Sequence, residues 1–99
     1  MTDRTTSAFA RLERELQQER VAALVRISAR LGQLVELVWG ARAELDAATG
    51  PDCEARLARY RALHAEACKY RWYLEVQRES IGLRQHGVLD RLFPMPGER

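Results

Sequence analysis

Residues 24–45 read LVRISARLGQLVELVWGARAEL, and this stretch decides the fold. Its apolar residues recur in steps of three and four, which is typical of a helix face that packs against a partner helix. A second apolar stripe lies about 120° round the same helix. Because one partner covers one stripe, this helix requires at least two neighbours. The first stripe comprises Ile27, Leu31, Leu34, Val38, Ala41 and Leu45, and the second Val21, Val25, Ser28, Gly32, Val35 and Trp39.

The composition around this stretch is that of one globular domain. The 99 residues are 46% hydrophobic and 30% charged, and the net charge is only +2. This near balance gives no argument for nucleic acid or for an acidic membrane as a partner. The longest apolar run, Val21–Val25, is far shorter than the ~20 residues of a membrane span. We therefore expect no membrane partner.

Two further features bear on the compartment. Residues 1–20 are polar and charged, unlike a secretory signal. Cys53 and Cys68 would lie about 22 Å apart on one helix, too far for a disulfide within the chain. A reducing environment fits free cysteines best. The sequence thus predicts a cytoplasmic protein.

The tetrapeptide Thr49-Gly50-Pro51-Asp52 separates two long helices. Glycine commonly follows a helix end, proline cannot continue a helix, and aspartate is a good N-cap. His86-Gly87 gives a similar stop, and Pro94 another. We therefore expect a disordered segment 1–6, a helix 7–48, a turn 49–52, a helix 53–85, a short helix 88–93 and a flexible tail 94–99.

The second helix also carries a seam in steps of three and four, formed by Tyr60, Leu63, Ala67, Tyr70, Leu74, Gln77 and Ile81. Short connections make consecutive helices antiparallel neighbours. The predicted fold is therefore all-α, a long antiparallel helical hairpin with a short C-terminal helical turn. Both helices have apolar surface beyond one seam, and an isolated hairpin is a poor core. The economical solution is a homodimer that forms a four-helix bundle.

The surplus apolar residues are the candidate partner-binding surface. Trp72, Val76 and Leu83 lie on the flank of the second helix that faces away from its seam, with Tyr73 beside them. The C-terminal residues Leu92, Phe93 and Met95 combine apolar anchors with prolines. Such a segment can dock into a groove of a partner or fold back over the bundle. The sequence predicts a small self-associating helical interaction or assembly module that also binds an unidentified protein.

A polar stripe formed by His64, Arg71, Glu75 and Arg78 runs beside the main seam of the second helix. Its spacings of seven, four and three place the four side chains on one flank. The stripe is either a ladder of ion pairs that fixes register or a site for a small anion formed between facing subunits, with or without catalysis. The ladder is the simpler interpretation, and we expect no enzyme activity and no cofactor.

Two other patterns suggest weaker alternatives. His64 and Cys68 are four residues apart, and a dimer could bring two such pairs together as a zinc site. We favour a small cysteine beside a hydrogen-bonded histidine, without a metal. The run Lys69-Tyr70-Arg71-Trp72-Tyr73 interleaves basic and aromatic residues, as single-stranded nucleic-acid sites do. On a helix these five side chains point in different directions, so nucleic-acid binding is not expected to be strong.

Overall fold

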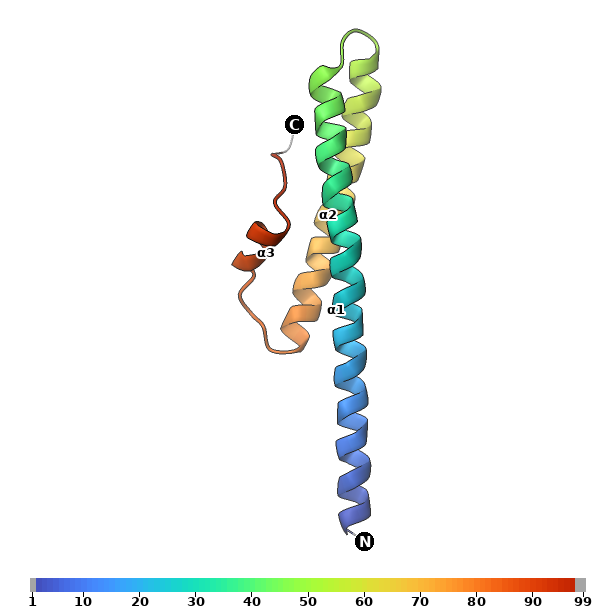
Figure 1. The fold of residues 1–99 in the computed structure, drawn as a ribbon, viewed down its shortest axis with the longest axis vertical. Coiled ribbons are helices and arrows are strands. Elements are labelled where there is room, and N and C mark those ends of the chain that lie inside the picture. The colour runs from blue at the N-terminus through green and yellow to red at the C-terminus, as the bar shows by residue number, and fades with distance from the viewer. Residues whose placement is uncertain (1, 98–99) are drawn as a thin grey trace.

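The computed structural model describes residues 2–97, which form two long helices and one short one (Figure 1). Helix α1 spans Thr2–Ala47, α2 spans Asp52–Ser80 and α3 spans Gly87–Leu92. The molecule measures 76 × 21 × 13 Å and its radius of gyration is 19.6 Å. A compact domain of this length would have a radius of gyration of about 13 Å. The predicted all-α helical hairpin is confirmed, and its shape is a rod.

The core lies between α1 and α2 where the two predicted seams meet. Leu31, Leu34, Val38 and Ala41 are buried on α1, and Ile27 and Leu45 are partly buried at the ends of the seam. Tyr60, Ala67 and Leu74 are the buried residues of α2. Tyr60 is 0% exposed, because the ring inserts between the helices. Burying the leucine and valine side chains of this core stabilises the hairpin by roughly 1.5–3 kcal/mol each.

The connection between α1 and α2 is as short as expected. Gly50 has a φ of +62°, a left-handed conformation that suits glycine, and its carbonyl accepts a hydrogen bond from the Cys53 amide at 3.2 Å. Pro51 rather than Asp52 is the N-cap residue, and no side chain caps the helix. Asp52 lies instead in the first turn with Glu54, where negative charge is favourable.

Helix α2 ends earlier than the predicted residue 85. Gly82 has a φ of +91°, and its amide bonds to the carbonyl of Glu79 while the Leu83 amide bonds to that of Arg78. This pair of bonds is a Schellman motif, which closes a helix at a glycine. The stop signal is therefore Gly82, and Gly87 begins α3 instead of ending α2.

Residues 83–97, which we call the C-terminal strap, run back along the hairpin and contain α3 (Figure 1). Leu89 is 2% exposed and belongs to the core, and Phe93 and Met95 are half-buried against it. Pro96 is buried as well. The expected flexible tail 94–99 is thus ordered against the hairpin in its described part, 94–97. The remaining two residues lie outside the described range.

The strap covers part of the second apolar stripe of α1. The ring of Phe93 lies 3.8 Å from the position that a Cβ of Gly32 would occupy. The indole Nε1 of Trp39 donates a hydrogen bond to the carbonyl of Pro94 at 2.8 Å. The second neighbour that α1 requires is therefore supplied, along this part of the helix, by the same chain.

The N-terminal part of α1 differs from the sequence expectation. The segment 1–6 was expected to be disordered, but its described part is helical from Thr2. Residues 3–22, which we call the α1 overhang, are all exposed and extend beyond the end of α2 (Figure 1). Helical continuity explains this order, because adding a turn to an existing helix avoids the cost of nucleation.

Candidate functional site

The end of the strap is held by side chains of both long helices. The carbonyl of Gly97 accepts hydrogen bonds from the Tyr60 hydroxyl at 2.5 Å and from Nη1 of Arg42 at 3.2 Å. The neighbouring Tyr60 side chain is the main cause that raises the pKa of Arg42. Backbone carbonyls need partners when they lose water. Residues 94–97 are therefore fixed by hydrogen bonds as well as by apolar contact.

His64 and Cys68 lie beside this anchor. The Nε2 atom of His64 is 3.2 Å from the Pro96 carbonyl, so it carries the hydrogen and donates it. In the neutral ring Nδ1 is then an acceptor, and it faces the Cys68 sulfur at 3.6 Å. Within residues 2–97, neither Cys53 nor Cys68 forms a disulfide. Within residues 2–97, no three His, Cys, Asp or Glu side chains are grouped to hold a metal ion.

The rest of the polar stripe also binds the chain's own groups. Arg71 forms ion pairs with Glu75 on the same helix and with Asp90 of α3. The hydrogen bond to Asp90 is the main cause that raises the pKa of Arg71, so the guanidinium stays charged. Arg78 donates to Nδ1 of His86 and to the Gln85 carbonyl. The stripe thus faces the strap, and each of its members contacts it or pairs with a residue that does.

The candidate partner-binding residues divide into two groups. Trp72 and Val76 lie one turn apart on α2 and are 59% and 41% exposed. Tyr73 packs against Trp72 with ring centroids 5.6 Å apart. We call these three residues the α2 flank. Leu83 and Leu92 are exposed too, but they border an apolar groove with α1, whereas Phe93 and Met95 pack against the core.

The basic and aromatic run of residues 69–73 is spread around α2. Lys69 pairs with Glu66 at 3.1 Å and Arg71 pairs with acidic groups, so both charges are partly neutralised. Tyr70 packs against the core while Trp72 faces solvent. The five side chains do not form one stacking surface.

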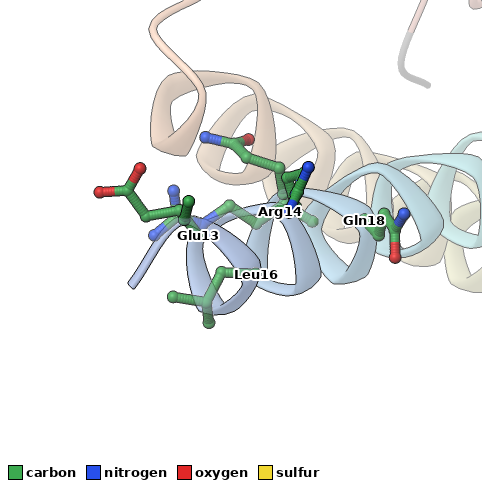
Figure 2. Close-up of a pocket in the computed structure, with 7 residues that line it drawn as sticks. Glu13, Arg14, Leu16 and Gln18 are labelled. Atoms are coloured by element: carbon green, nitrogen blue, oxygen red, sulfur yellow. The ribbon is translucent and has the colours of Figure 1, made fainter. Parts of the chain in front are cut away.

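The α1 overhang carries a further apolar surface. Phe9, Leu12 and Leu16 are 62%, 51% and 43% exposed. Figure 2 shows residues that line a shallow hollow along this helix, among them Leu16 and the polar residues Glu13, Arg14 and Gln18. All the residues that line the hollow come from α1. A space bounded by one helix cannot enclose a ligand. The apolar surface of the overhang therefore suits a second helix better than a small molecule.

Sequence reasoning missed the residues that hold the strap, namely Trp39, Arg42 and Tyr60. Their carbonyl partners lie 55, 55 and 37 residues away. No local pattern marks such a contact, because the acceptors are backbone groups that every residue carries. The one available signal was Tyr60, which occupies a position in the predicted seam. The hydroxyl of a buried tyrosine needs a hydrogen-bond partner.

Comparisons of the chain with models of protein families, with curated proteins and with solved structures found no match. Among the described residues, no helix is long and apolar enough to cross a membrane.

Proposed function

We propose that the chain is a helical protein–protein interaction module that associates with itself and binds a further protein through the α2 flank. The observation that carries the proposal is the exposure of large apolar side chains on both long helices after the strap has folded back. Trp72 is the clearest case, since tryptophan is enriched among the residues that dominate binding energy.

Two features support the flank as a binding surface. Trp72 and Val76 project from α2, a helix that is anchored along its other side by Tyr60 and Leu74. A rigid scaffold lowers the entropy lost on binding. The flank lies outside the polar stripe, whose side chains are engaged with the strap. These contacts favour the register role of the stripe over the small-anion site.

Trp72→Ala tests the flank. We expect it to reduce the retention of a specific partner at least tenfold, because a buried interface tryptophan typically contributes about 2 kcal/mol or more. The full-length chain is used as bait in an extract of its source cells, and retained proteins are quantified by mass spectrometry.

Leu37→Ala is the matched control, since Leu37 is a 42% exposed apolar residue on the other long helix. The control should retain the same proteins as the original chain. Equal retention by the Trp72 variant would exclude the flank as the binding surface. Circular dichroism should show the same helix content in all three proteins, because neither residue belongs to the core.

A further inference from the structure

The α1 overhang is a helix without a neighbour. Every residue from 3 to 22 is exposed, and Phe9, Leu12 and Leu16 leave 43–62% of their surface in water. Most of the stability of helices in proteins comes from packing an apolar face, and the overhang packs none of its face within residues 2–97. The overhang therefore has both the surface and the need for a partner helix.

The exposed side chains continue the seam that packs against α2. Eighteen residues make about five complete turns of an α-helix, so Phe9 lies on the same line as Ile27 and Leu45. Both of those residues pack against the core. Leu12 and Leu16 flank the same line at helical spacing. The overhang thus extends an established interface along a stretch where α2 is absent.

The register of the hairpin shows where this vacant stretch begins. Arg42 lies over the ring of Tyr60, and Arg30 over the ring of Tyr70. In antiparallel register, these pairs place the last residue of α2 at about the level of residues 20–22 of α1. The vacant seam therefore spans the overhang from about residue 3 to residue 20.

We infer that the overhang of a second copy fills this vacancy in antiparallel orientation. Its direction would be that of α2, and it would lie in line with α2 along the same seam. The two overhangs have equal length, so the two-fold axis falls near residue 11. Phe9 of one copy then packs against Leu12 of the other, and the reverse contact follows by symmetry.

The charge of the overhang favours this occupant. Residues 3–20 contain four acidic residues and four arginines, so the segment is neutral overall. Helices that lie on anionic membranes carry an excess of Lys and Arg on the polar face. A neutral, evenly mixed segment avoids repulsion between copies as well. The groove at Leu83 and Leu92 and the α2 flank remain free for other partners.

The first experiment is sedimentation velocity over a concentration series, and its interpretation rests on the self-association proposed above. The contact is small, so we expect dissociation at about micromolar concentration. Leu12→Gln should weaken the dimer at least tenfold. Val21→Gln is the control, because Val21 is similarly exposed on the same helix but lies off the seam, and it should change the dimer little.

The second experiment measures orientation. Spin labels are attached at Arg4→Cys, Arg11→Cys or Gln18→Cys in a full chain that also carries Cys53→Ser and Cys68→Ser. These positions are seven residues apart and share one side of the helix. In the antiparallel pair the label at residue 11 gives the shortest distance between copies. Labels at residues 4 and 18 are each displaced by about 21 Å along the axis and give longer distances.

Each outcome decides the question. Equal distances at the three positions would overturn the antiparallel pair in favour of a parallel one. A dimer that resists Leu12→Gln but is dissociated by Trp72→Ala would place the contact on the α2 flank, so that the inference fails while the proposed self-association stands. A monomer at every concentration would refute both, and binding of a further protein to the flank would still be measured separately.

Discussion

Gly82 and Gly40 have different backbone conformations, and this difference determines how a side chain at each position changes the stability of the fold. Gly82 has a φ of +91° in the motif that ends α2. Gly40 lies inside α1, and a Cβ there would meet no other side chain or segment of the chain within 4 Å. L-residues other than glycine avoid the left-handed region, whereas alanine is favoured over glycine in a helix interior.

We therefore predict opposite effects of the same substitution. Gly82→Ala should lower the free energy of unfolding by about 1–2 kcal/mol, and Gly40→Ala should raise it by up to about 1 kcal/mol. Urea unfolding followed by circular dichroism measures both. Destabilisation by Gly40→Ala would show that its surface is occupied in solution, and a neutral Gly82→Ala would argue against the helix end described above.

The two helix ends also show what the sequence allows one to predict. Gly50-Pro51 was recognised because proline cannot continue a helix. Gly82 was overlooked because it stands between Ile81 and Leu83, which match the helical apolar pattern. The decisive hydrogen bonds connect Leu83 to Arg78 and Gly82 to Glu79, and they depend on a backbone conformation rather than on side chains. His86-Gly87 was a plausible stop, but the chain had already left the helix.

At the scale of elements, the strap reduces the apolar surface that α1 leaves exposed below the amount expected from the sequence. The seams of α1 and α2 followed from their spacing, since helical periodicity is a local property. The docking of the strap could not be predicted from spacing, because it depends on contacts such as that of Trp39 with Pro94, 55 residues apart. It converts part of the surplus surface of α1 into core. The exposed α2 flank was predicted from the pattern of α2 and does not involve the strap.

Leu89 and Leu92 offer a direct test of strap docking. Both lie on α3, but Leu89 is 2% exposed and Leu92 is 64% exposed. Leu89→Ala removes buried methyl groups, which typically costs about 2–5 kcal/mol. The strap should release, and hydrogen–deuterium exchange in residues 83–97 should rise.

Leu92→Ala should change the stability by no more than about 0.5 kcal/mol, because surface substitutions rarely do more. Similar exchange profiles for the two variants would contradict the asymmetric burial of α3. Exchange in α2 should rise much less than exchange in the strap in the Leu89 variant, because the seam with α1 remains intact.

At the scale of the whole molecule, the rod shape makes oligomerisation visible in solution scattering. The single chain has a radius of gyration of 19.6 Å, well above the value for a compact domain. Pairing through the overhangs lengthens the rod, whereas a side-by-side four-helix bundle mainly thickens it.

Small-angle scattering separates these arrangements. At concentrations well below the dissociation constant we expect a radius of gyration of about 20 Å, the value of the single chain. As the concentration rises, end-to-end pairing should increase the maximum dimension of the particle well beyond 76 Å, the length of one chain. An unchanged maximum dimension at doubled mass would instead indicate a bundle, and a small, compact particle would contradict the rod itself.

The position of the strap after both long helices has a consequence for biosynthesis. Translation proceeds from the N-terminus, so both long helices emerge from the ribosome before residues 83–97, and the hairpin can form in the interval before the strap docks. During that interval Gly32 and Trp39 lack the residues that later cover them, Phe93 and Pro94. The chain therefore exposes more apolar surface before the strap docks than after it. A chain truncated near residue 82 would keep these two positions uncovered and would be prone to aggregation.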